Sequence, residues 1–135
     1  MPTALPFVAA AYAALFGLLS AVLTTRVIMN RVRSGIQAGD GGDASLARAI
    51  RAHANFAEQV PLALLLLVLV EGLGVGAPIV HALGATLVVA RLANALGLSR
   101  SLGPTPPRQA GAALTLLMIV AASLLIFYRL VVPHA

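Results

Sequence analysis

Two long stretches without a charged residue constrain the fold of this chain more than any other feature. Phe7–Thr25 contains 19 residues and Gln109–Tyr128 contains 20, and neither includes Asp, Glu, Lys or Arg. Each stretch matches the roughly 20 residues that an α-helix needs to cross about 30 Å of hydrocarbon. The sequence therefore predicts that both stretches are membrane-spanning helices.

The composition of the whole chain also indicates an integral membrane protein. Of its 135 residues 60% are hydrophobic and 10% are charged, and the mean hydropathy is +0.98. Soluble domains carry about 25% charged residues, and a small globule cannot bury so much apolar surface. The net charge of +5 comes from arginine alone, with only 4% aromatic residues, which argues against nucleic-acid binding. The chain has no cysteine, so disulfides and thiolate metal sites are excluded.

Two less regular apolar segments between these stretches complete a set of four spans. Each span is expected to be a helix, because backbone in lipid must form its hydrogen bonds within its own segment. We expect an all-α, transmembrane, up-and-down four-helix bundle with one domain over residues 1–135. The first stretch has no preceding Lys or Arg, so it is expected to be a retained span and not a signal peptide. The expected spans are approximately 5–33, 44–73, 77–98 and 108–131.

The arginines predict the orientation of the bundle. Ser34–Asp43 and Ser99–Pro107 are the two loops flanked by most of the arginines, and they fall on the same side of a four-span protein. The other side carries only Arg129 near the membrane. Because positively charged loops remain in the cytoplasm, we expect both loops to be cytoplasmic and both termini to lie outside.

A polar stripe interrupts the second span and is the main indication of function. Its members are Arg48, Arg51, Asn55 and Glu58. Spacings of three, four and three residues place these side chains on one face of an α-helix. Ionisable side chains within a membrane are costly, and they mark functional sites by default.

The third span contains Arg91, which is expected to lie level with Arg51 and Asn55 and within reach of Glu58. Arg51 is seven residues from the expected helix start at Ala44, and Arg91 is seven residues from Leu98, so each lies about 10 Å from a cytoplasmic helix end. Arg26, Asn30 and Arg33 form a similar polar face on the first span, and Arg108 begins the fourth. The sequence thus predicts that several basic groups converge in the cytoplasmic leaflet.

Two explanations of this cluster remain open. In the first, Glu58 pairs with Arg91 or Arg51 to hold the helices together, and the other arginines reach the headgroups. In the second, the excess positive charge binds an anionic ligand, because one carboxylate cannot neutralise several buried arginines. The fork of an arginine suits two-point recognition of a carboxylate.

Other polar residues are expected to have local roles. Asp43 is a candidate N-cap of the second span, and Glu71 is expected in solvent at the outer end of that span. Pro61 removes the hydrogen bond to the Ala57 carbonyl and is expected to bend the helix. His53 lies two residues from Arg51 and hence off the polar stripe, and no second ligand at metal-binding spacing accompanies it.

The run Arg51-Ala-His-Ala-Asn-Phe-Ala-Glu58, followed by Pro61, resembles the signature of the MAPEG family. These are the membrane-associated proteins in eicosanoid and glutathione metabolism. The resemblance extends over four spans and includes Ala90-Arg91-Leu92 in the third, and it is greatest to bacterial members. It implies a homotrimer of four-helix subunits that binds glutathione as cosubstrate between neighbouring subunits near the cytoplasmic face.

The resemblance also implies roles for individual residues. Arg51, Asn55, Glu58 and Arg91 would hold glutathione, and His53 within the signature is counted with them. Arg108 would stabilise the thiolate, and Arg31 is a second candidate for that catalytic role. In active eicosanoid relatives aromatic or histidine side chains follow the third-span arginine at two positions, where this chain has Asn94 and Leu98.

The leading hypothesis is a glutathione transferase or peroxidase that acts on lipophilic electrophiles in the membrane. A non-catalytic member, in which the polar cluster only holds the trimer together, is the alternative. A small transporter is disfavoured, because such four-span proteins resemble one another in an essential carboxylate in the first span, where Phe7–Thr25 has none.

Overall fold

The computed structural model describes residues 5–132, apart from the side chains of residues 99 and 100, and it folds as four long helices. These are α1 (Phe7–Ser34), α2 (Ala44–Gly72), α3 (Ala77–Arg100) and α4 (Pro106–Val131). Each is long and apolar enough to cross a membrane. The expected all-α architecture with four spans is therefore confirmed.

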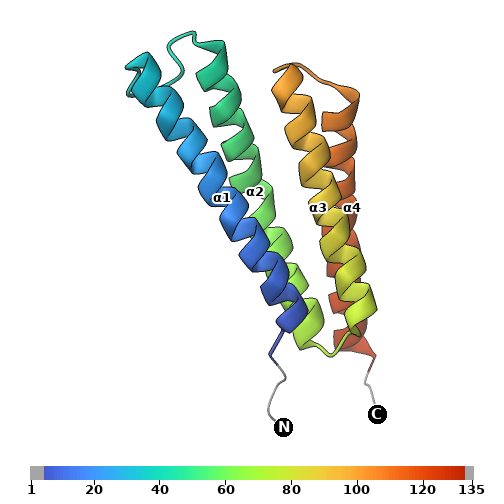
Figure 1. Cartoon of the computed structure of the whole chain (residues 1–135). Helices are drawn as coiled ribbons and strands as arrows, with labels where there is room; N and C mark the ends of the chain where they lie inside the picture. Colours follow the sequence, from blue (N-terminus) through green and yellow to red (C-terminus); the bar gives the residue numbers. More distant parts are fainter. Residues whose placement is uncertain (1–4, 133–135) are drawn as a thin grey trace.

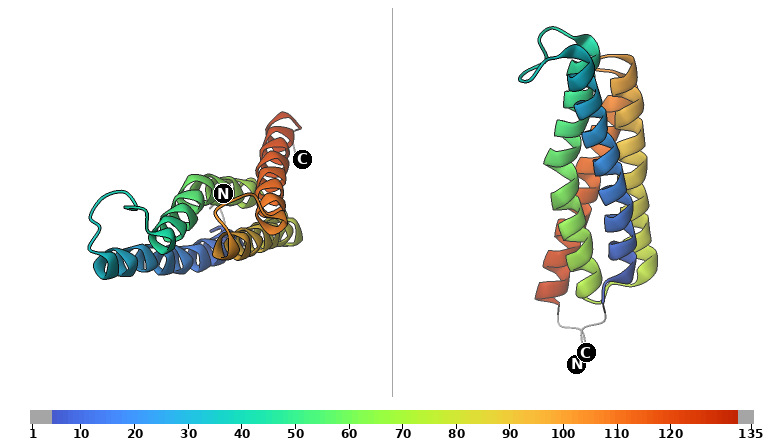
Figure 2. Two further views of the ribbon diagram at one scale, coloured as in Figure 1. Left: turned by 90° about the horizontal axis from the view of Figure 1, so that it is seen from above. Right: turned by 60° about the vertical axis from the view of Figure 1, so that its left-hand side comes forward.

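The helices alternate in direction and form two hairpins, α1–α2 and α3–α4 (Figure 1). The α1–α2 and α3–α4 loops lie at one end of the molecule, and both ends of the described chain lie at the other (Figure 1). In the same view the two hairpins meet near the α2–α3 turn and diverge toward the end with the two loops. Seen from above, the α1–α2 loop projects to one side, away from α3 and α4 (Figure 2).

Local sequence explains where α2 begins. Asp43 has an extended backbone conformation, and its carboxylate accepts a hydrogen bond of 2.8 Å from the Leu46 amide. This N-cap was predicted from the sequence. Pro61 lies within α2, on an exposed part of its surface, and the helix continues through it to Gly72.

The start of α1 depends on a residue from another helix. Pro6 precedes α1 and offers no side-chain cap. The Glu71 carboxylate, near the end of α2, instead accepts hydrogen bonds from the Val8 amide at 3.0 Å and the Ala9 amide at 2.7 Å. The expectation that Glu71 lies free in solvent was therefore wrong: the free amides of a helix N-terminus attract a carboxylate.

The interior is built mainly from apolar side chains of all four helices. Phe16, Leu67, Leu87 and Met118 are each at most 2% exposed and lie at its centre. α3 and α4 approach so closely that a Cβ atom on Gly111 would lie 2.5 Å from the Ala90 carbonyl oxygen. Many leucines on the outer faces remain exposed, as expected of surfaces that face lipid tails.

Candidate functional site

The centre of the candidate site is Arg91, which is 5% exposed and the one buried charged residue in the described part of the chain. It lies 14 residues from the start of α3 and seven from Leu98, or about 21 and 10 Å along the helix axis. Both distances place its guanidinium group within the hydrocarbon region. A cation at this depth requires polar partners, because an unpaired ion in lipid costs several kcal/mol.

Neutral oxygens from two other helices supply these partners. Arg91 Nη1 donates to Asn55 Oδ1 of α2 at 2.9 Å. Its Nη2 donates to Thr115 Oγ1 and, at 3.4 Å, to the Gly111 carbonyl of α4. Thr115 also donates to the same carbonyl at 2.8 Å. Arg91 thus connects α2, α3 and α4, while its buried Nε has no hydrogen-bond partner among the described residues.

Arg91 lies level with Asn55, as the sequence predicted, and donates a hydrogen bond to it. No ion pair joins Glu58 to an arginine among the described residues. Arg51 and Glu58 are exposed, and Asn55 is half-buried. Neither charged residue lines the cavity beside Arg91, which Asn55 does line. The explanation in which Glu58 pairs with Arg91 or Arg51 within one chain is therefore not supported.

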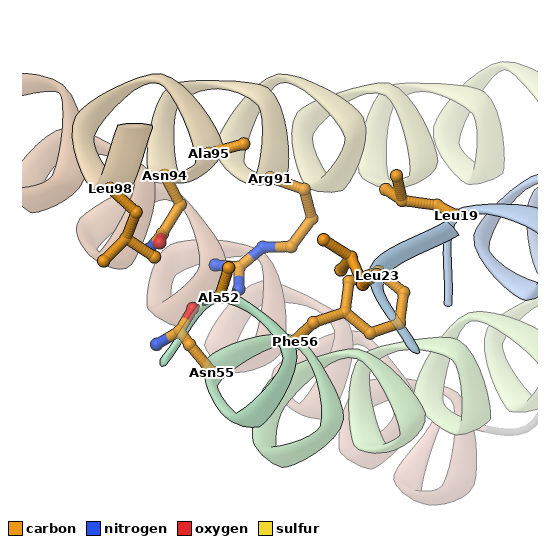
Figure 3. Close-up of a pocket in the computed structure, with 9 residues that line it drawn as sticks. All are labelled: Leu19, Leu23, Ala52, Asn55, Phe56, Arg91, Asn94, Ala95 and Leu98. Atoms are coloured by element: carbon orange, nitrogen blue, oxygen red, sulfur yellow. Dashed lines mark hydrogen bonds between the residues drawn. The ribbon is translucent and has the colours of Figure 1, made fainter. Parts of the chain in front are cut away.

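The Arg91–Asn55 hydrogen bond also orients the Asn55 amide. Because Asn55 Oδ1 accepts from Arg91, its amide nitrogen is left to donate elsewhere. Figure 3 shows the oxygen of Asn55 toward Arg91 and its nitrogen directed away from the guanidinium group. The polar stripe of α2 consequently presents an N–H donor between an exposed cation and an exposed carboxylate.

Arg91 lines both a small cavity and a larger apolar cleft. The cavity has a volume of about 40 Å³. The cleft, of about 310 Å³, lies between α1 and α3 and has only apolar atoms on its surface. The cavity is lined by Leu19, Leu23, Ala52, Asn55, Phe56, Arg91, Asn94, Ala95 and Leu98 (Figure 3).

The other predicted basic groups do not converge on Arg91 within a single chain. Arg26 and Arg33 line a separate hollow of about 720 Å³ on the outer face of α1. In that hollow Asn30 Oδ1 accepts a 2.9 Å hydrogen bond from Ser45 Oγ. The prediction of one shared basic zone was wrong for these α1 residues, because α1 turns that face outward and contributes only Ala9 and Phe16 to the buried core.

The two candidate thiolate-stabilising arginines are engaged with loop backbone. Arg31 Nη1 donates to the carbonyls of Ile36 at 3.2 Å and Gly39 at 3.0 Å. Arg108 Nη1 donates to the carbonyls of Leu102 at 2.6 Å and Gly103 at 3.2 Å. Both side chains are half-buried and stabilise the loops at one end of the bundle. His53 is half-buried on α2 and does not line the cavity.

Sequence reasoning missed two partners of Arg91, namely Thr115 and Gly111. Both are small residues spaced four apart in an apolar helix, a pattern that is common where membrane helices approach closely. That pattern could have identified the face of α4 that meets α3. It could not have shown which polar side chain on α3 would meet the threonine.

These features define a multi-pass helical membrane protein with a buried arginine network beside an exposed polar stripe. The model of the MAPEG family matches residues 9–128, and the chain belongs to that family.

The chain is also similar to the inner membrane protein YecN of Escherichia coli strain K12. The two are 36% identical over 90 residues, which cover 67% of this chain and 69% of that protein. YecN of Escherichia coli O6:H1 matches to the same extent. With its four apolar helices, this chain is a multi-pass protein of the bacterial inner membrane.

Proposed function

We propose that this protein binds glutathione on the polar stripe of α2 and acts as a glutathione transferase or peroxidase on lipophilic electrophiles. The observation that supports this most directly is the hydrogen bond from Arg91 to Asn55. It holds the Asn55 amide as a donor between Arg51, which suits a carboxylate, and Glu58, which suits an amino group. Membership of the MAPEG family is consistent with this ligand.

We propose further that the site is completed by neighbouring subunits of a homotrimer. Glu58 lies 14 residues from each end of α2, or about 21 Å along its axis, yet it is exposed on the isolated chain. A carboxylate exposed to lipid at this depth is unfavourable. Contact with a second copy and a polar ligand would remove that cost, and native mass spectrometry of the detergent-solubilised protein tests for the trimer.

The proposed chemistry requires a thiolate and an apolar substrate in one place. Cations near the glutathione thiol lower its pKa and raise the fraction of thiolate, which is the nucleophile. Arg108, with Arg31 as the second candidate, would supply that charge. The sulfur forms a bond to the electrophilic carbon while the leaving group departs with the bonding pair. The apolar cleft between α1 and α3 suits the lipophilic partner.

Calorimetric titration of the purified protein with glutathione tests binding, and conjugation of an aryl chloride tests catalysis. We expect binding at millimolar concentration or below, weakened at least tenfold in Arg51→Ala. We expect conjugation to be lost in Arg108→Ala but retained in Arg129→Lys, which keeps its charge at the other end of the bundle. Absence of glutathione binding at millimolar concentration would refute the proposal.

The alternative is a non-catalytic role for the same fold, and one observation favours it. Asn94 and Leu98 are buried against the interior at 4% and 3% exposure, where the active eicosanoid relatives carry groups that contact the tripeptide. In this case Glu58→Gln and Arg51→Ala would weaken the oligomer in detergent. Neither substitution would alter glutathione binding, because in this case the unmodified protein does not bind glutathione.

A further inference from the structure

Arg91 carries a buried positive charge that nothing ionised neutralises in the described part of the chain. Its three hydrogen-bond acceptors, Asn55, Thr115 and the Gly111 carbonyl, are all neutral. Its Nε is fully buried without a hydrogen-bond partner there. Neutral oxygens satisfy N–H donors but leave the net charge in the hydrocarbon region, where it remains costly.

The small cavity beside this group contains a second buried polar side chain. Asn94 is 4% exposed and follows Arg91 by almost one helical turn on α3. Both side chains line the cavity and extend from α3 toward α2 (Figure 3). The Asn94 side chain has no hydrogen bond to any described residue, so its amide N–H groups remain available as donors.

The size of the cavity limits what it can hold. Its volume is about 40 Å³, whereas one water molecule needs about 10–15 Å³ on a comparable measure. Two or three waters or one monatomic anion fit, but a tripeptide does not. Leu19, Leu23 and Phe56 form much of the wall and would give few hydrogen bonds to water.

We propose that this cavity is a binding site for a small monovalent inorganic anion, chloride under physiological conditions. The Arg91 guanidinium group supplies the opposite charge, and the Asn94 amide donates a hydrogen bond. The apolar side chains of α1 and Phe56 exclude water. The bound ion neutralises Arg91 and fixes α1, α2 and α3 relative to one another. The inference is independent of whether glutathione binds on the exposed part of the α2 stripe.

Thermal unfolding of the full chain in detergent tests the proposal. Sodium chloride, sodium bromide and sodium gluconate are compared at equal ionic strength, because gluconate is too large for the cavity. A ligand that binds only the folded state raises Tm with its concentration. We expect chloride and bromide to raise Tm by about 3–6 °C over gluconate at saturation. Equal Tm values in the three salts would overturn the proposal.

Two variants and one control assign the effect to this cavity. Arg91→Gln removes the charge, and Ala52→Leu fills the space while retaining the arginine. Both are expected to abolish the difference between chloride and gluconate. Arg26→Gln removes an exposed arginine on α1 that does not line the cavity, so it should retain the difference. Retention of the full chloride effect in Ala52→Leu would contradict the assignment.

Diffraction provides a measurement that needs no variant, in case Arg91→Gln does not fold. Crystals of the unmodified protein grown in sodium bromide should give an anomalous peak within hydrogen-bond distance of Arg91 or Asn94. Crystals in which bromide peaks occur only at the surface, with water or nothing in this cavity, would refute the site. Loss of glutathione binding, by contrast, would leave this result unaffected.

Discussion

Thr115 of α4 takes part in two hydrogen bonds of the buried arginine network. Its hydroxyl oxygen accepts from Arg91 of α3, and its hydroxyl proton is donated to the Gly111 carbonyl. Thr115→Val keeps the shape of the side chain but removes both interactions. We expect the free energy of unfolding to fall by about 1–2 kcal/mol, measured by thermal or denaturant unfolding in detergent.

The control is Thr86→Val, on α3. Thr86 also donates to the carbonyl four residues earlier, that of Ala82 at 2.8 Å, but among the described residues no arginine donates a hydrogen bond to it. Its replacement should change stability by no more than about 0.5 kcal/mol. Equal effects of the two substitutions would mean that the contact of Thr115 with Arg91 contributes nothing to stability.

At the same scale, the stripe of α2 shows what residue spacing can and cannot predict. The spacing correctly placed Asn55 level with Arg91, because the depth of each residue follows from its distance to a helix end. It did not show that Arg91 would bond Asn55 and two groups of α4 in place of Glu58. The choice of partner depends on how each helix is rotated about its axis, which spacing within one helix does not determine.

At the scale of elements, the close approach of α3 and α4 depends on Gly111. A Cβ atom there would lie 2.5 Å from the Ala90 carbonyl oxygen and 2.9 Å from the backbone nitrogen of Asn94. Both are backbone atoms, so the helices must separate to admit it. Gly111→Ala is expected to lower the free energy of unfolding by about 1–3 kcal/mol and to weaken the contact of Arg91 with Thr115.

Gly17 in α1 is the matched control, since a Cβ atom added there would meet nothing within 4 Å. Alanine is a better helix former than glycine by about 1 kcal/mol, so Gly17→Ala should leave stability unchanged or raise it. Comparison of the two unfolding midpoints checks both expectations. A Gly111→Ala protein as stable as the unmodified chain would show that α3 and α4 can repack at no cost.

The caps of α1 and α2 differ in how far they could be foreseen. Asp43 caps its own helix three residues away, so a local pattern was sufficient to predict it. Glu71 caps α1 across a separation of 62 and 63 residues, and no local pattern indicates such a contact. The four helices themselves were predictable, because hydrophobic length is a property of each segment alone.

The Glu71 cap leads to a prediction for the start of α1. Glu71→Ala removes both hydrogen bonds to the first turn, so we expect faster amide hydrogen exchange at Val8 and Ala9 and a loss of about 1–2 kcal/mol of local stability. Asp43→Ala should instead accelerate exchange at Leu46. Unchanged exchange at Val8 and Ala9 in Glu71→Ala would show that water or lipid headgroups replace the carboxylate.

At the scale of the whole molecule, the alternation of the helices brings the arginine-flanked loops to one end. The α1–α2 and α3–α4 loops share that end, and the described chain begins and finishes at the other (Figure 1). Arg31 and Arg108 lie near the loops and bond their carbonyl groups, whereas Arg129 bonds the Gly74 carbonyl in the opposite turn at 2.6 Å. The fold thus preserves the asymmetry of charge on which the predicted orientation depends.

That orientation is testable because the chain has no cysteine, so a single introduced thiol reports its own side of the membrane. Ala38 in the α1–α2 loop and Ala77 at the α2–α3 turn are both exposed. By the positive-inside bias, a membrane-impermeant maleimide should label Ala77→Cys in intact spheroplasts and Ala38→Cys only after the membrane is permeabilised. The reverse pattern would place both termini in the cytoplasm. It would also move the α2 stripe, which is nearer the loop end, away from the cytoplasmic glutathione pool on which the proposed function depends.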